Sequence, residues 1–297
     1  MDRVRLLLER WRMMANTWLV FDVSYLAYRA LYTTGDLSHE GVNTGVVFGM
    51  FQTVMGLQDR FGTDQIAWCF DAGHQKRSQV WSKYKTNRKP SKDDDELRQA
   101  RGLLREQLGL LRTKYLPFVG FPNVFWQDGY EADDMIASVC EHMPRGDLAV
   151  IVSSDHDMYQ LLSRERVLLF NPQKKQTITQ DSFGREHGID PTLWADVLAI
   201  AGCVGDGVEG VKGVGEVTAV KFLTGRLKST TKAFVSITRN EDVWRRNLFL
   251  TRLPFRGTRK CELKSAQFDS SLWDKLLERL GMKSLIGRNR HGRDSET

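Results

Sequence analysis

Acidic residues occur in two tight clusters of this sequence, one reading EADD and the other SSDHD. Two further aspartates, Asp22 and Asp71, each come directly after an apolar run. Carboxylate oxygens are the ligands that hard divalent cations such as Mg²⁺ and Mn²⁺ prefer, and so many like charges in one place raise one another's pKa values unless a cation compensates them. Seven acids are therefore candidates for one metal site: Asp22, Asp71, Glu131, Asp133, Asp134, Asp155 and Asp157.

Each cluster also has an ordinary structural explanation. Acids such as Glu131 and Asp133 at the start of a helix interact favourably with its dipole, by about 0.3 to 1 kcal/mol each. Asp155, between a strand and a helix, has the position of an N-cap. Taken alone, neither cluster distinguishes metal binding from helix capping. The distinction depends on where the strands and helices place the acids.

Three short apolar runs, at 17–21, 66–70 and 148–152, have the composition of strands buried on both faces. Helical periodicity separates them, at 46–58, 96–114 and 132–142. This alternation predicts an α/β fold with a mostly parallel central sheet and helices on both faces. In such a sheet the ligand crevice lies beyond the carboxyl ends of the strands, where all these acids would meet.

A basic stretch follows Asp71. From 72 to 92 it contains seven Lys and Arg residues and no acid, with Trp81 and Tyr84 between them. Such a run is often only a solvated face, but beside a carboxylate site it can hold phosphates and stack bases. The candidate residues in it are Lys76, Arg77, Lys83, Tyr84, Lys85 and Arg88.

Glycines recur at the spacing of a helix-hairpin-helix in the segment GVKGVG. Gly210, Gly213 and Gly215 would allow a tight turn, and the backbone N–H groups that follow could approach a phosphate, with Lys212 beside them. The alternative is a glycine-rich turn between core helices.

The composition is that of an ordinary globular chain of 297 residues, with 41% hydrophobic residues and a net charge of +6. No run approaches the roughly 20 apolar residues of a spanning helix, so we expect no membrane partner. The four cysteines form no CxxC pair, which argues against a zinc ribbon or disulfide framework and for a reducing cytoplasm. They are Cys69, Cys140, Cys203 and Cys261.

Four segments follow from these patterns. Residues 1–15 form an N-terminal extension, with Met13 or Met14 as an alternative start, and 16–180 form the α/β core. Residues 181–286 form a helical region with the hairpin at about 200–225, including expected helices at 191–201, 217–224 and 273–279. Residues 287–297 carry no apolar side chain, and we expect them to be disordered.

The order of these pieces resembles the flap endonuclease family. The motifs of that family occur here in the same order, over about residues 16–280. They are Asp22 with Arg29 beyond it, Asp71, YKTNR, EADD, SSDHD and GVKGVG. The resemblance is strongest to phage 5′ nucleases and to the 5′ to 3′ exonuclease domain of bacterial DNA polymerase I. It implies a PIN-like nuclease core in a bacterial or phage-infected cell.

The resemblance further implies a two-metal phosphodiesterase that uses Mg²⁺ or Mn²⁺. Asp71, Glu131, Asp133 and Asp155 match positions that hold the first metal. Asp22 matches a further acid of that centre. The rest of the acidic cluster is matched by Asp134, Asp157 and Asp206.

The remaining matched positions concern DNA. Lys85 and Arg88 match a helical arch at about 72–95 through which the 5′ end passes, and Lys85 would contact the scissile phosphate. Arg29 would hold the cleaved strand. The hairpin would bind duplex DNA, in this family often with a K⁺ ion. The implied partners are DNA with 5′ ends, flaps or nicks and a DNA polymerase, and the implied state is a monomer.

This sequence departs from the family's pattern just before the hairpin. Where relatives read like GDxxDN, Cys203 takes the place of a metal-binding Asp and Gly207 that of an Asn. A neutral thiol is a poor Mg²⁺ ligand, so the second metal position is doubtful. Two alternatives therefore stay open: a DNA-binding protein of the same fold with little or no nuclease activity, and a nuclease acting on RNA.

Overall fold

The computed structural model describes residues 16–88, 95–265 and 268–287. The expected N-terminal extension at 1–15 and nearly all of the expected disordered tail lie outside the described residues, as does the part of the predicted arch at 89–94. None of the described helices is long and apolar enough to cross a membrane.

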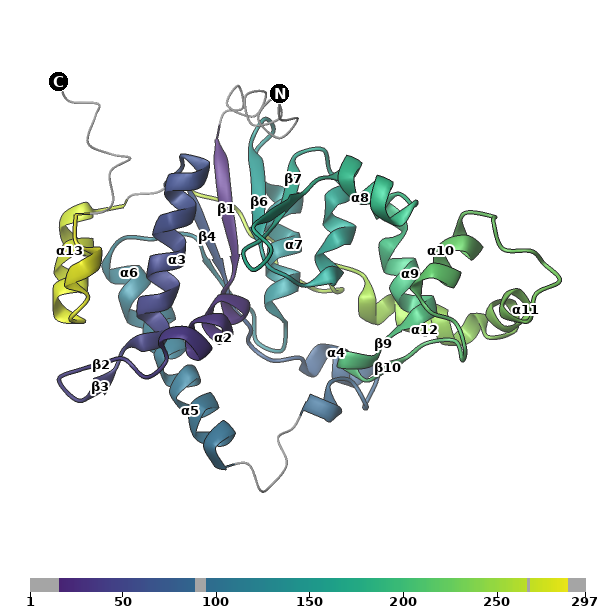
Figure 1. The fold of residues 1–297 in the computed structure, drawn as a ribbon, viewed down its shortest axis with the longest axis horizontal. Helices are drawn as coiled ribbons and strands as arrows, with labels where there is room; N and C mark the ends of the chain where they lie inside the picture. The colour runs from purple at the N-terminus through teal and green to yellow at the C-terminus, as the bar shows by residue number, and fades with distance from the viewer. Residues whose placement is uncertain (1–15, 89–94, 266–267, 288–297) are drawn as a thin grey trace.

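A six-stranded sheet in the order β5-β4-β1-β6-β7-β8 forms the centre of the protein (Figure 1). All neighbouring strands are parallel except β7 and β8, which are antiparallel. The six strands are β1 (Thr17–Asp22), β4 (Ile66–Cys69), β5 (Val124–Phe125), β6 (Leu148–Val152), β7 (Val167–Asn171) and β8 (Gln176–Ile178).

Both faces of the sheet are covered because the central strands carry apolar side chains on both faces. In β1, Leu19 and Phe21 enter one core, whereas Trp18 and Val20 enter the other. On the first face pack α2 (Val23–Thr34), α3 (Gly45–Phe61), α5 (Asp95–Leu110), the π-helical turn Leu111–Tyr115 and α6 (Leu116–Phe118). On the second face pack α7 (Ala132–His142), the 3₁₀ segment His156–Ser163, α8 (Gln180–His187) and α9 (Trp194–Ala201).

The C-terminal half adds the predicted helical group, at the end of the molecule beyond α8 in Figure 1. It contains α10 (Glu216–Leu223), α11 (Lys232–Arg239) and α12 (Glu241–Thr251) beside α9. The α/β fold with a mostly parallel sheet and a C-terminal helical region is thus confirmed. The shorter elements are β2 (Ser38–His39), β3 (Val42–Asn43), α4 (Gln75–Val80), β9 (Gly202–Cys203), β10 (Val208–Glu209), and the 3₁₀ turns Thr86–Arg88, Pro191–Leu193, Val204–Asp206 and Lys283–Leu285.

The last helix does not stay with that group. In α13 (Ser270–Arg279), Trp273 packs against Phe51 of α3 with ring centroids 4.6 Å apart, and Leu276 and Leu277 are buried in the same core. The predicted region 181–286 therefore divides in the structure, because the amphipathic face of α13 covers the first face of the sheet.

Candidate active site

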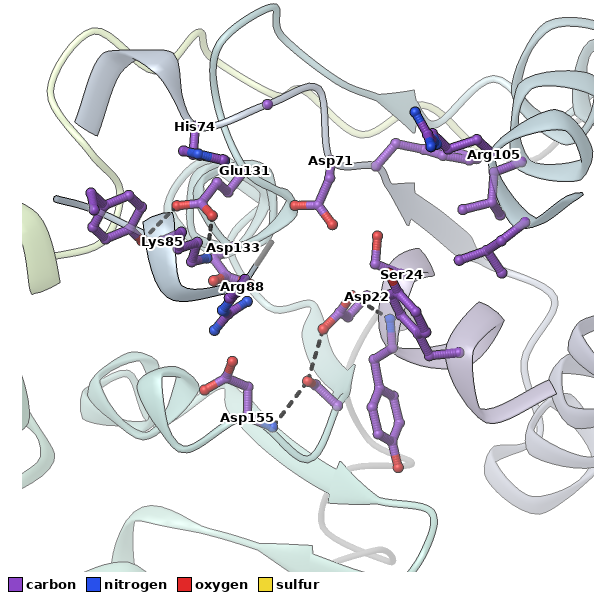
Figure 2. Close-up of a pocket in the computed structure, with 18 of the residues that line it drawn as sticks. Asp22, Ser24, Asp71, His74, Lys85, Arg88, Arg105, Glu131, Asp133 and Asp155 are labelled. Atoms are coloured by element: carbon purple, nitrogen blue, oxygen red, sulfur yellow. Dashed lines mark hydrogen bonds and ion pairs between the residues drawn. The ribbon is translucent and has the colours of Figure 1, made fainter. Parts of the chain in front are cut away.

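A cleft of about 1090 Å³ opens at the carboxyl ends of β1, β4 and β6. Five of the predicted acids line it, and Figure 2 shows their carboxylates around one space. The sheet brings them together because each follows a strand or begins the helix after one. They are Asp22, Asp71, Glu131, Asp133 and Asp155.

Hydrogen bonds fix the carboxylates of Asp22 and Asp71 and the backbone of Asp155. Asp22 caps α2 by accepting from the Tyr25 N–H at 3.0 Å, and its second oxygen accepts from the Ser153 hydroxyl at 3.0 Å. Ser153 in turn accepts from the Asp155 N–H at 3.2 Å, and Asp71 accepts from the Ala132 N–H at 2.8 Å. Capping is thus part of the role of these acids. It explains where each one sits but not why all of them face one cleft.

Crowding of the acids changes their protonation. Burial, with Asp71 and Asp155 nearby, raises the pKa of Asp22 to about 7, and burial with Asp155 and Asp22 holds the pKa of Asp133 well above its usual value. The pKa of Asp157 rises to about 8 through burial, Asp155 and Asp206. Such a set of oxygen donors lacks positive charge, and a hard divalent cation would supply it.

The side chains are of the type that binds a divalent metal, but they are not arranged around one coordination point. Among the described residues, no three His, Cys, Asp or Glu side chains already stand as a coordinating group. Basic side chains neutralise part of the cluster instead: Lys85 Nζ pairs with Glu131 and lies 3.8 Å from Asp206, and Arg88 pairs with Asp206. Burial disfavours the Lys85 charge, but Glu131 and Asp206 together raise the pKa of Lys85 above its ordinary value.

Lys85 is held in an uncommon backbone conformation, with φ of 53°. Its N–H donates to the Asp206 carbonyl at 2.7 Å, and Arg88 Nε donates to the Gly205 carbonyl at 2.9 Å. A Cβ at Gly207 would lie 2.6 Å from the Lys83 carbonyl oxygen. The unusual Gly207 therefore has a structural reason: it lets the basic segment pack directly on the loop before the hairpin.

Three sequence expectations need correction. Arg77 is only 3% exposed and holds fully buried Asp134 with two hydrogen bonds of 2.6 and 2.8 Å, so it cannot reach DNA. Asp134 is correspondingly closed to a metal ion. Tyr84 is also buried, and its hydroxyl donates to Glu131 at 2.8 Å. Arg77, Asp134 and Tyr84 all contact Glu131 and hold it in place, and Tyr84 does so from the wall of the cleft. Within a basic run, the sequence alone does not distinguish a buried arginine from an exposed one.

The other predicted positions are distributed as follows. Asp157 and Asp206 lie beside the five cleft acids, and burial followed by these two aspartates raises the pKa of the half-buried Cys203, which keeps its thiol neutral. Arg29 is half-buried and donates to Thr53 at 3.3 Å. The remaining DNA-binding candidates include the exposed residues Lys76, Lys83, Lys212, Gly213 and Gly215, and the half-buried Gly210.

Two of the three hairpin glycines are required by the backbone geometry. Gly213 has φ of 77°, in the left-handed region that glycine favours. A Cβ at Gly210 would lie 2.2 Å from the Ala201 backbone, so this close approach also needs glycine. The turn leads into α10, whose N-cap Gly215 provides no side-chain cap.

Three residues of the cleft were not among the site residues predicted from the sequence. Ser153 links Asp22 to Asp155, and Arg105 and Arg112 line the cleft from the side of α5. A signal for the arginines was present, because Arg98, Arg101, Arg105 and Arg112 recur at spacings of three, four and seven and so lie along one helical face.

The sheet order and the acidic cleft define a resolvase-like α/β domain. The family model described as "5'-3' exonuclease, N-terminal resolvase-like domain" matches residues 17–188. The chain therefore belongs to the 5′–3′ exonuclease family, which confirms the resemblance seen in the sequence.

Individual relatives agree. The chain is 30% identical to the 5′–3′ exonuclease of Aquifex aeolicus over 211 residues, which are 70% of this chain and 69% of that protein. It is 34% identical to DNA polymerase I of Pseudomonas aeruginosa over 210 residues, but these are only 22% of the polymerase. The structure of bacteriophage T5 flap endonuclease in complex with DNA and metal ions shares the fold, with a TM-score of 0.66, 21% identity, and coverage of 80% of this chain and 90% of that one.

Proposed function

We propose that this protein is a divalent-metal-dependent, structure-specific nuclease that hydrolyses phosphodiester bonds at 5′ ends or 5′ flaps of DNA. The observation that carries the proposal is the convergence of five carboxylates and Lys85 on one cleft in a member of the 5′–3′ exonuclease family. The T5 relative of the same fold was solved with DNA and metal ions, which supports both the substrate and the cofactor.

The side chains of the cleft have distinct roles in this proposal. Two Mg²⁺ or Mn²⁺ ions would be held by the cleft acids Asp22, Asp71, Glu131, Asp133 and Asp155. Asp157 and Asp206 would support the second ion. When bound, such ions activate water and stabilise the leaving oxygen.

Lys85 pairs with Glu131 at the edge of the acidic cluster. We propose that its ammonium group faces the scissile phosphate of bound DNA. There its charge stabilises the transition state.

The duplex part of the DNA would be held outside the cleft. Exposed Lys76 and Lys83, together with Arg29, extend the positive charge of the basic segment. Lys212 and the open N–H groups at the start of α10 suit a duplex phosphate, with K⁺ as a candidate ion at the hairpin. Because the matching part of one relative is a segment of DNA polymerase I, we also propose a polymerase as functional partner.

One observation favours a second function. The neutral thiol of Cys203 stands among Asp157 and Asp206, where it weakens the donor set for a second ion. A DNA-binding protein of this fold with little nuclease activity would have such a site.

A 5′-labelled DNA flap incubated with Mg²⁺, Mn²⁺ or EDTA distinguishes the two functions. Cleavage near the flap junction with either metal and none in EDTA is the expected result. Tight binding without products in any metal would favour the binding protein instead. Faster cleavage of a matched RNA flap would move the substrate from DNA to RNA.

Lys85→Ala is expected to lower the single-turnover cleavage rate far more than DNA affinity, because a transition-state contact acts on rate. Lys212→Ala should do the reverse and reduce the salt slope of binding by about one phosphate. Single-turnover rates and affinities measured at several salt concentrations check both. If both variants lost affinity equally at unchanged rate, the basic segment would be a phosphate-binding face only.

Cys203→Asp is expected to lower the Mg²⁺ concentration needed for half-maximal cleavage, since a carboxylate gives Mg²⁺ a hard, charged ligand. The parent should be helped disproportionately by Mn²⁺, which accepts softer ligands. Cys261→Asp is no useful comparison, because Cys261 is fully buried; Cys203→Ser, which adds no charge, is the better control. Identical Mg²⁺ midpoints for parent and Cys203→Asp would show that position 203 does not contribute to metal binding.

A further inference from the structure

The cleft extends beyond the acids along α5. Arg105 and Arg112 line this part of it, with Leu108 and Gly109 between them. Figure 2 shows Arg105 on the other side of Asp71 from Lys85 and Arg88. The acidic centre is thus flanked by positive charge on two sides, and the proposed function uses only one of them.

A tryptophan adjoins Arg112 just outside the set of residues that line the cleft. The Arg112 guanidinium is 5.0 Å from the centre of the Trp126 ring, and the Arg259 guanidinium is 5.8 Å from the same ring. Trp126 is 37% exposed, unlike the fully buried Trp68 of the core. Two cations meeting at one exposed ring form a surface that attracts anions and offers an aromatic face.

Within the part of the chain that the structure describes, these arginines have no carboxylate partner. Among the described residues, no ion pair involves Arg105, Arg112 or Arg259. The Nε of Arg112 is buried and has no hydrogen-bond partner among the described residues. The charges of Arg112 and Arg259 are thus not compensated by a described carboxylate, which leaves them available to an anionic ligand.

The backbone that carries Arg112 is irregular. Arg112 lies in the π-helical turn Leu111–Tyr115 that follows α5. Single π-helical turns are rare and occur frequently at functional sites, since they rotate one side chain out of the regular helical register.

We propose that Arg112, Trp126 and Arg259 form a second nucleic-acid subsite for single-stranded DNA on the 5′ side of the cleaved bond. A phosphate is held between the two guanidinium groups, and an unpaired base stacks on Trp126. This rests on the proposed function, and it names the part of the substrate that this end of the cleft binds.

Single-stranded DNA is the ligand that matches this chemistry. Aromatic side chains beside arginines bind unpaired bases irrespective of sequence, whereas the base faces of a duplex are covered by their neighbours. The hairpin proposed to hold the duplex lies on the opposite side of α4 from α5 in Figure 1. A strand that leaves the duplex and crosses the acids therefore reaches Arg112 and Trp126 as a single strand.

The test compares flap lengths. Affinities for DNA with a 5′ flap of one nucleotide or of about eight are measured in EDTA, so that no cleavage occurs. Trp126→Ala and Arg112→Gln should weaken binding of the long flap by about tenfold, the scale of one lost base–aromatic stack, and leave the short flap unchanged. The control is Phe118→Ala, because Phe118 is 47% exposed but, among the described residues, has no arginine over its ring as Trp126 has. If Trp126→Ala and Phe118→Ala bound the long flap equally well, the subsite would be refuted.

A fluorescence measurement separates this proposal from the proposed function. Oligothymidylate should quench the tryptophan emission of the parent more than that of Trp126→Phe, whether or not the protein cleaves DNA. Quenching without cleavage in any metal would remove the nuclease proposal and keep the subsite. Equal quenching of both proteins, or competition by polyglutamate as strong as by oligothymidylate, would overturn the single-strand assignment.

Discussion

Asp155→Asn is expected to reduce the cleavage rate by at least about 100-fold while DNA affinity in EDTA stays within about twofold of the parent. Loss of one electrostatic contribution in an active site is commonly of this size. Asp155 lies at the centre of the acidic cluster, because it contributes to the raised pKa values of Asp22, Asp133 and Asp157. Removing its charge therefore weakens the whole donor set for a divalent cation.

The substitution should leave the fold intact. Asp155 caps the 3₁₀ segment His156–Ser163 through a 2.8 Å hydrogen bond from the Asp157 N–H, and asparagine caps a helix about as well as aspartate does. Its carboxylate is not enclosed by the core, since Asp155 is an exposed residue. A loss of cleavage can thus be attributed to the lost charge.

Asp190→Asn is the matched control for this prediction. Asp190 is also exposed and also caps a 3₁₀ turn, accepting from the Thr192 N–H at 2.9 Å, but it lies outside the cleft. Single-turnover cleavage of a 5′ flap is measured for parent and both variants with saturating Mg²⁺. Turnover of Asp155→Asn within tenfold of the parent would show that Asp155 is not part of the metal site.

The acids of the cleft were predictable because their spacing and the strand pattern are both local. Strands β1 and β6 were predicted to within a residue at each end, and the rule that ligands bind beyond the carboxyl ends of parallel strands then brought Asp22 and Asp155 together. The helix Ala132–His142 was predicted with the observed bounds, since EADD marks its start and an apolar face its length.

Contacts between distant segments were not predictable in this way. Trp126 and Arg259 are far apart in the chain, and only the folded loops place the guanidinium over the ring. The position of α13, away from the other C-terminal helices, was not predictable for the same reason. The amphipathic pattern of α13 shows that one of its faces is buried, but not which part of the protein that face packs against. The helix α2 was not among the helices predicted from the sequence.

Arg77 is the clearest case in which position in the sequence misleads. Its neighbours in the basic run, Lys76 and Lys83, are exposed, but Arg77 is 3% exposed. Besides Asp134 it reaches Glu131 at 3.1 Å, and its Nε donates to the Leu250 carbonyl at 3.0 Å. The arginine thus ties α4 to the start of α7 and to α12.

Arg77→Met is therefore expected to lower the free energy of unfolding by about 3 to 5 kcal/mol, the usual cost of removing one partner from a buried ion pair. Asp134 would remain fully buried with only the N–H groups of Phe255, at 2.8 Å, and Glu131, at 3.2 Å, as hydrogen-bond donors. Urea unfolding in EDTA measures the change. Lys76→Met makes the same kind of substitution one residue away on the surface and should change stability by less than about 0.5 kcal/mol.

A double variant identifies the cause of the loss. Arg77→Met combined with Asp134→Asn removes both charges and keeps the amide oxygen that can accept from Phe255. If the unpaired carboxylate is what destabilises Arg77→Met, the double variant must unfold at a higher urea concentration than Arg77→Met alone, because no uncompensated charge is left in the core. Equal midpoints for the two would mean that Arg77 acts through packing against Phe255, whose ring lies 4.8 Å from the guanidinium, and that the ion pair contributes little. In both variants Glu131 keeps Lys85 but loses the guanidinium of Arg77. Cleavage by both variants should therefore stay below that of the parent even where stability is recovered.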